Sequence, residues 1–116
     1  MSEESYVQIS WTCGNLDEAR QISRLLVEKR LVACANIIPW VESVFLWNGQ
    51  VDTAQESKVI FKTRRSLFEL VKEVILKNAK YELPEILMTP ILDGNKEYLD
   101  WVEESTRKEI SCSFGA

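Results

Sequence analysis

The chain has 116 residues, a hydrophobic share of 46% and a charged share of 28%, which are typical of one soluble globular domain. Its net charge of −4 argues against sequence-independent binding to nucleic-acid phosphates. No apolar run approaches the ~20 residues that span a bilayer, and the acidic beginning of the chain differs from a basic signal peptide. We therefore expect a cytoplasmic protein with one domain over residues 1–116, a core over about residues 6–108, and no nucleic-acid or membrane partner.

The cysteines and histidines limit the metal chemistry that the chain can support. Cys13, Cys34 and Cys112 are an odd number without a C-x-x-C pair, and the chain contains no histidine. Neither a disulfide nor a closed tetrahedral zinc site is therefore expected. We interpret Cys13 and Cys34 as small buried thiols, and Cys112, in the polar tail SCSFGA, as exposed.

A strand and a helix are expected first. Apolar and polar side chains alternate over residues 6–13, which predicts a strand. Asn15, followed by Glu18 three residues later, forms a capping-box pattern at the start of a helix. The apolar residues that share one face of this helix are Leu16, Ala19, Ile22, Leu25 and Leu26.

A long hairpin follows. Residues 31–47 are rich in strand-forming residues, but Pro39 cannot donate a ladder hydrogen bond, so we expect a bend or bulge there that divides the ribbon into two arms. Asn48-Gly49 is the preferred pair for a type I′ hairpin turn, because both positions tolerate a positive φ. The returning strand is expected over about residues 51–63.

The second helix and the last strand follow the hairpin. Ser66 and Glu69 form another capping box, before a helix that must end ahead of Pro84. Its expected buried stripe consists of Leu67, Leu70, Val71, Val74 and Ile75. Residues 85–93 are expected to form a strand, part of which Pro90 places on an edge or in a bulge.

Asn95 is expected to cap a third helix that carries Tyr98, Trp101 and Val102 toward the core. The order β-α-β-β-α-β-α predicts an α+β fold, namely a ferredoxin-like βαββαβ sandwich with an extra C-terminal helix. Two helices would cover one sheet face and leave the other bare. Because we expect that face to be rich in Val, Ile, Phe and Trp, and the hairpin arms to overhang, we predict self-assembly.

Five motifs resemble those of the CutA family of divalent-cation tolerance proteins in order and spacing. They are A-C-x-N-I-I-P, W-x-G, K-T-R, Y-E-x-P-E-I and Y-L-x-W, within a likeness over about residues 7–107. The resemblance implies a cytoplasmic, ferredoxin-like homotrimer in which bent hairpin arms continue a neighbour's sheet. It also implies a role in tolerance of copper and other divalent metal ions, through binding and without an established reaction.

The resemblance places the family's copper ligands, a cysteine and two adjacent histidines, at Trp11, Asn78 and Ala79. An indole and a methyl group offer no usable lone pair, and an amide is a weak donor, so these positions are not expected to bind copper. No cofactor is required on this interpretation. Any divalent metal, copper included, would bind weakly, and the candidates are Glu82 and Glu85.

Two interpretations stay open for the polar segment NAKYELPEI, residues 78–86. It forms either a structural network that holds the turn into the last strand, or part of a cleft between subunits that binds a metal ion or a small ligand. The residues that would line the cleft are Asn36, Trp47, Lys62, Tyr81, Glu82, Glu85 and Trp101.

The remaining polar features do not indicate an enzyme. Lys62-Thr63-Arg64-Arg65 is interpreted either as a solvated strand end or as an anion site at a helix N-terminus. Without a histidine or a recognisable nucleophile, catalysis is not expected. Besides metal response, two functions stay open: a PII-like trimeric regulator that binds a small anion between subunits, and a trimeric interaction scaffold.

Overall fold

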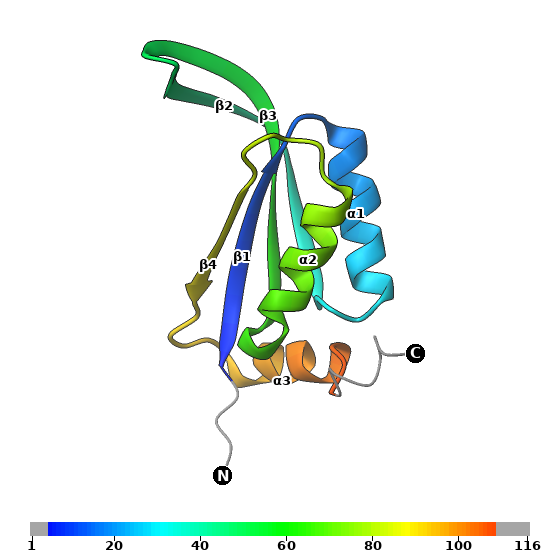
Figure 1. Ribbon diagram of the computed structural model, residues 1–116. Coiled ribbons are helices and arrows are strands. Elements are labelled where there is room, and N and C mark those ends of the chain that lie inside the picture. Colours follow the sequence, from blue (N-terminus) through cyan, green and yellow to red (C-terminus); the bar gives the residue numbers. More distant parts are fainter. Residues whose placement is uncertain (1–4, 109–116) are drawn as a thin grey trace.

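The structure, a computed structural model, describes residues 5–108 (Figure 1). The elements are β1 (Tyr6–Cys13), α1 (Leu16–Glu28), β2 (Cys34–Trp47), β3 (Gln50–Arg64), a 3-10 turn (Arg65–Leu67), α2 (Phe68–Asn78), β4 (Glu85–Pro90) and α3 (Lys96–Ser105). The order β-α-β-β-α-β-α is therefore confirmed, and the fold is α+β. No helix within residues 5–108 is long and apolar enough to cross a membrane.

The four strands form one antiparallel sheet in the order β2-β3-β1-β4, so β2 and β4 are its edges. The register places Ile9 of β1 opposite Phe61 of β3 on one side and Met88 of β4 on the other. Helices α1 and α2 lie over one face of the sheet, and α3 lies across the end of the sheet where β1 begins (Figure 1).

The core lies between the sheet and the two helices α1 and α2. Alternation along β1 turns Val7, Ile9, Trp11 and Cys13 toward the helices, and all four are buried. The rings of Trp11 and Phe61 stack with their centroids 6.3 Å apart. Because each large apolar side chain contributes about 1.5–3 kcal/mol when buried, this layer holds the fold together.

The hairpin agrees with the local sequence signals. Asn48 and Gly49 have φ angles of 52° and 79°, as a type I′ turn requires. The register of β2 against β3 shifts between Ile38 and Val41, which confirms the bulge expected at Pro39. The Ser57 hydroxyl donates a hydrogen bond to the Pro39 carbonyl at 3.0 Å.

Both capping boxes depart from their expected form. The Asn15 side chain accepts from the Glu18 N–H at 2.8 Å, as predicted, but the Glu18 carboxylate accepts from the Lys80 N–H at 3.1 Å. The capping box at Ser66 is wrong, because a 3-10 turn intervenes and α2 begins with Leu67 at its N-cap. Leu67 is fully buried, so the apolar contact with the core determines where this helix starts.

The C-terminal part of the fold differs from expectation in two details. The last strand ends at Pro90, so it is shorter than the expected residues 85–93 although it does lie on an edge. In α3, Val102 is buried as predicted, whereas Trp101 is 44% exposed and lies beside Tyr98 with ring centroids 5.5 Å apart. The placement of Trp101 toward the core is therefore wrong, because the helix turns only a narrow stripe inward.

The sheet face that α1 and α2 leave uncovered is more polar than expected. The strand alternation that buries Trp11 and Phe61 turns a mostly polar set to the uncovered face. That set includes Gln8, Ser10, Thr12, Lys58, Ile60, Lys62, Leu87 and Thr89. The expected surface of Val, Ile, Phe and Trp therefore does not lie on this face.

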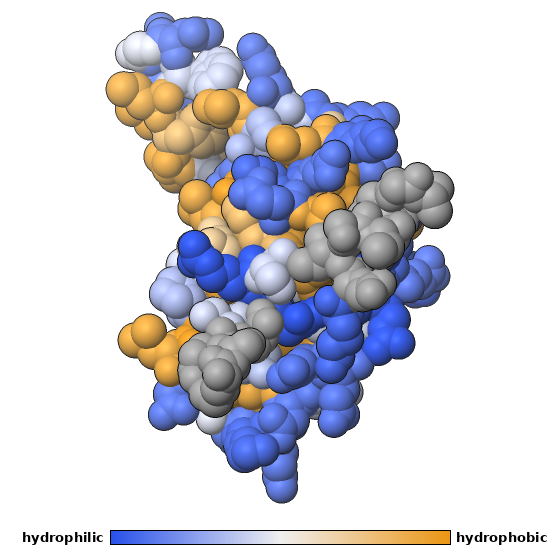
Figure 2. Space-filling model, turned by 60° about the horizontal axis from the view of Figure 1, so that its bottom comes forward, coloured by the Kyte–Doolittle hydropathy of each residue, from blue (hydrophilic) through white to orange (hydrophobic). Residues whose placement is uncertain are grey.

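The exposed apolar surface lies instead on the hairpin arm, which we define as residues 39–56 beyond the bulge. Trp40 and Leu46 are each 69% exposed, and Val44, Trp47 and Val51 are exposed beside them. Hydrophobic atoms accordingly gather at the end of the molecule that carries the arm (Figure 2).

Candidate functional site

The three positions to which the resemblance assigns the family's copper ligands carry neither a cysteine nor a histidine. Trp11 is buried in the core. Asn78 ends α2, where its side-chain amide donates to the Val74 carbonyl at 2.7 Å, and the Ala79 N–H donates to the Ile75 carbonyl at 2.7 Å. Within residues 5–108, no three side chains among Cys, His, Asp and Glu form a group that could hold a metal ion.

The surface beside Asn78 is nevertheless open to solutes. A hollow of about 620 Å³ lies between α1 and the end of α2. Its walls include Asp17, Glu18, Asn78 and Lys80. Asn78 is therefore accessible from this hollow.

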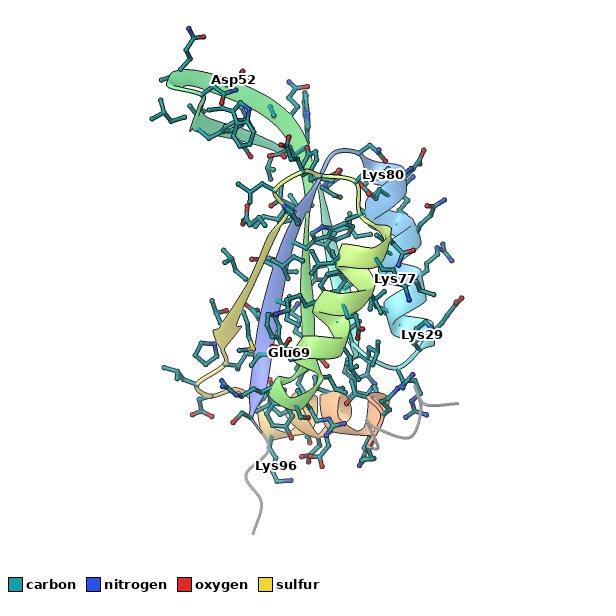
Figure 3. The ribbon with its side chains drawn as sticks, viewed as in Figure 1. Lys29, Asp52, Glu69, Lys77, Lys80 and Lys96 are labelled. Carbon is teal, nitrogen blue, oxygen red and sulfur yellow. The ribbon has the colours of Figure 1, made fainter. Side chains whose placement is uncertain are left out.

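The loop after α2 is tied to the start of α1. In Figure 3, Lys80 lies where this loop passes α1, and its backbone N–H meets the Glu18 carboxylate. The ring of Tyr81 covers Gly14, where an added Cβ would lie 3.2 Å from the ring. These contacts favour a structural role for the part of the polar segment that contains Lys80 and Tyr81.

Burial, with a smaller contribution from two acidic side chains, raises the pKa values of two groups at this end of the sheet. Burial raises the pKa of the Tyr81 phenol to about 12, together with a hydrogen bond to Glu56 and its negative charge. Burial also raises the pKa of the Cys13 thiol to about 11, with a further contribution from the charge of Glu18. At neutral pH both groups keep their protons, so Cys13 is a poor nucleophile and a poor metal ligand.

The two acidic candidates for a weak cation site lie in different surroundings. Glu85 accepts a hydrogen bond from the Thr12 hydroxyl at 3.1 Å and lies 3.7 Å from the Lys58 ammonium. That positive charge opposes the binding of a metal cation at Glu85. Glu82 is exposed in the loop before β4.

The seven residues proposed to line a cleft do not meet within one chain. Lys62 donates to the side-chain oxygen of Asn36 on the neighbouring strand, and both share the uncovered sheet face with Glu85. Tyr81 and Glu82 lie in the loop at one end of this face. Trp47 ends β2 at the tip of the hairpin arm, and Trp101 lies on α3 at the opposite end of the molecule (Figure 1). A cleft that contains all seven would require a second copy.

The basic cluster does not act as a unit. Arg64 is only 5% exposed, and its Nε donates to the Thr106 hydroxyl at 2.9 Å. Another guanidinium nitrogen of Arg64 donates to the Arg107 carbonyl. The Thr63 hydroxyl donates to the Leu31 carbonyl at 2.6 Å, and Arg65 is exposed. Both earlier interpretations are therefore wrong for Arg64, which fastens the chain after α3 to the end of β3.

The cysteine expectations are partly confirmed. Cys13 is a buried free thiol, whereas Cys34 is a free thiol of intermediate exposure beside Tyr98. Burial, and then the neighbouring Cys34, raise the pKa of the Tyr98 phenol. Cys112 lies outside the described residues.

Fold and site together define a small α+β protein with one antiparallel sheet, and residues 5–108 contain no preformed metal centre. The chain belongs to the CutA family, because the family described as "CutA1 divalent ion tolerance protein" matches residues 7–105.

Relatives and solved structures agree with this assignment. The divalent-cation tolerance protein CutA of Thermus thermophilus is 44% identical over 95 residues, which are 82% of this chain and 92% of that protein. The chloroplastic protein CutA 1 of Oryza sativa is 38% identical over 84% of this chain. The chain spans about half the length of this protein and of the chloroplastic CutA of Arabidopsis thaliana, 55% and 53% respectively.

Two of the solved structures show how far the fold is shared. That of CutA1 from Oryza sativa superposes with a TM-score of 0.87 at 35% identity, and covers 90% of this chain and 96% of that one. The structure titled as the periplasmic divalent cation tolerance protein CutA from Archaeoglobus fulgidus has a TM-score of 0.83 at 38% identity. It covers 86% of this chain and 97% of that one.

Proposed function

We propose that this protein is a ferredoxin-like homotrimer that acts in the response to divalent metal ions by binding and not by catalysis. The family membership supports the connection to divalent ions. The strand order β2-β3-β1-β4, with α1 and α2 on one face, supports the ferredoxin-like assignment.

The observation that carries the proposal is the exposed apolar hairpin arm. Trp40, Leu46 and Val51 are large apolar side chains in water, and a contiguous surface of this kind is typical of an interface. The edge strands β2 and β4 also present backbone groups that can pair with strands of another copy. Three copies that exchange arms would bury both features at once.

Binding without catalysis has support from the protonation states. The Cys13 thiol and the Tyr81 phenol stay neutral near pH 7, so neither supplies an activated nucleophile. Assembly would bring Trp47 and Trp101 of different copies nearer to the remaining cleft candidates, and a metal ion or small ligand would bind there. We propose that no cofactor is required, and that divalent cations bind weakly at Glu82 or Glu85 through oxygen.

We also propose a cytoplasmic location. The free thiols of Cys13 and Cys34 favour a reducing compartment, since oxidising compartments promote disulfides. Several relatives have names that place those proteins in chloroplasts or the periplasm, so the compartment differs within the family.

Light scattering coupled to size-exclusion chromatography tests the assembly. At micromolar concentration we expect three times the chain mass. The variant Leu46→Glu should lower this mass, because it places a charge in the proposed interface. Thr53→Glu, on the same arm at an exposed and already polar position, is the matched control. A monomeric wild type would contradict the proposal.

A further inference from the structure

A second hollow, of about 490 Å³, lies between α1 and the edge strand β2. This volume falls within the range of about 300–1,000 Å³ that is typical of small-molecule sites. Arg20, Ser23, Arg24 and Val27 line it from α1, and their spacing places them on one face of the helix. Ala35 and Ile37 line it from β2.

Ser23 is one of the residues that line this hollow, and its hydroxyl is a buried polar group. The residue is only 4% exposed, and within residues 5–108 its Oγ has no hydrogen-bond partner. A serine inside a helix usually donates to the carbonyl four residues earlier, which compensates for its burial. A buried hydroxyl without such a bond costs free energy, unless a bound molecule supplies the partner.

The rim of the hollow is positively charged. Arg20 and Arg24 are exposed, and neither guanidinium forms a hydrogen bond or an ion pair with another residue of the described chain. Glu28 supplies the negative charge at this rim, so two positive charges face one negative charge. Two guanidinium groups one helical turn apart fit the oxygens of a carboxylate or a phosphate.

The wall below the rim is apolar. Val27 is exposed, while Ala35 and Ile37 are partly buried and pack against the core. An apolar group inserted between α1 and β2 would cover these three side chains. The hollow therefore combines two free cations, an unpaired hydroxyl and an apolar wall.

We propose that this hollow binds a small organic anion whose carboxylate or phosphate head carries a short apolar tail. The head lies between Arg20 and Arg24, and a rotation of the buried Ser23 side chain lets its hydroxyl donate a hydrogen bond to the head. The tail packs against Val27, Ala35 and Ile37. All residues of this site belong to one chain, so its formation requires neither a second copy nor a metal ion.

Amide chemical shifts of the isotope-labelled protein provide the test. Hexanoate and hexyl phosphate supply the two anionic heads on the same tail, and hexanol supplies the tail without a charge. We expect saturable shifts over residues 20–28 and 35–37, with a dissociation constant on the order of 1 mM for the better anion. Hexanol should bind about tenfold more weakly.

Three variants separate the contributions. Arg24→Gln should weaken binding of the anion about five- to tenfold, and Glu28→Gln should strengthen it. Arg65→Gln makes the same change of charge at an exposed side chain outside the hollow, and should leave binding unchanged. Ser23→Ala should weaken binding and also raise the melting temperature of the free protein, because it removes an unpaired buried hydroxyl.

Several results would overturn the proposal. These are equal binding of hexanol and hexanoate, the same loss in Arg65→Gln as in Arg24→Gln, or shifts confined to the hairpin arm. A lower melting temperature of Ser23→Ala would mean that the hydroxyl already has a partner. If a second copy contacts Ala35 and Ile37, and no anion binds saturably up to about 10 mM, the hollow is part of a contact between copies and not a ligand site.

Discussion

The Nε of Arg64 donates a hydrogen bond to the hydroxyl of Thr106 at 2.9 Å, so the end of β3 is fastened to the residue that ends α3. The same hydroxyl donates to the Val102 carbonyl at 2.9 Å, and both Arg64 and Thr106 are buried. Because the partners are distant in sequence, this contact helps to hold α3 against the sheet.

Replacement of Thr106 by valine tests this contact. Thr106→Val keeps the shape of the side chain but leaves the Arg64 Nε without this acceptor, which should lower the free energy of unfolding by about 1–3 kcal/mol. Thr89→Val makes the same change at an exposed position on β4 and should cost less than about 0.5 kcal/mol. Urea unfolding at one fixed protein concentration measures both, and equal effects would contradict the structural role of Thr106.

A second prediction concerns the two exposed tryptophans. Trp40 lies on the hairpin arm with 69% of its surface exposed, and Trp101 lies on α3 with 44% exposed. Trp40→Ala should raise the concentration at which the assembly dissociates at least about tenfold, because aromatic anchors dominate many interfaces. Trp101→Ala should have the smaller effect. Light scattering over a dilution series would refute this order if the Trp101 variant dissociated first.

A third prediction follows from the buried thiol of Cys13. Its pKa of about 11 in the folded chain lies above the ordinary 9.0, so the unfolded state loses this proton first as the pH rises. The stability present below pH 9 should therefore decrease between about pH 9 and 11, by about 1–3 kcal/mol for this group.

Comparison with Cys13→Ala removes that contribution, together with the smaller effect of the Cys13 charge on the pKa of Tyr81. The burial that raises the pKa values of Tyr81 and Tyr98 acts in both proteins. The measurement is the urea midpoint of both proteins from pH 7 to 11. The urea midpoint of the variant should decrease less steeply with rising pH than that of the wild type. Parallel profiles would mean that the pKa of Cys13 is the same in the folded and the unfolded state.

Local signals predicted most of the fold. Alternation along β1, the Asn48-Gly49 pair and the cap at Asn15 each act within a few residues, and the structure agrees with all three. The cap at Ser66 failed because burial of Leu67 outweighs a local hydrogen-bond pattern. The exposure of Trp101 depends on how α3 meets the sheet, which its own periodicity does not determine.

The candidate site was less predictable, because its contacts join distant parts of the chain. Arg64 resembled a solvated strand end, and nothing near it in sequence indicates Thr106 as its partner. Glu56 raises the pKa of Tyr81 from another element, and the unpaired Ser23 hydroxyl has no sequence signal. The resemblance assigns the family's copper ligands to Trp11, Asn78 and Ala79, which stays a prediction, and the structure adds that Trp11 is buried while Asn78 is accessible.

We propose that this family member binds divalent ions without a cysteine or histidine at Trp11, Asn78 and Ala79. The double variant Asn78→His/Ala79→His places two imidazoles beside the open hollow at the end of α2. It should raise the Cu²⁺ affinity at least about tenfold, because imidazole is a far stronger copper ligand than an amide or a methyl group. Cys112→Ser is the control for copper bound by a thiolate.

Calorimetric titration of Cu²⁺ at neutral pH, without a chelating buffer, is the most direct test. We expect weak binding to the wild type and to Cys112→Ser, and tighter binding to the double histidine variant. Submicromolar binding that survives Cys112→Ser, and that the two histidines do not improve, would contradict this proposal.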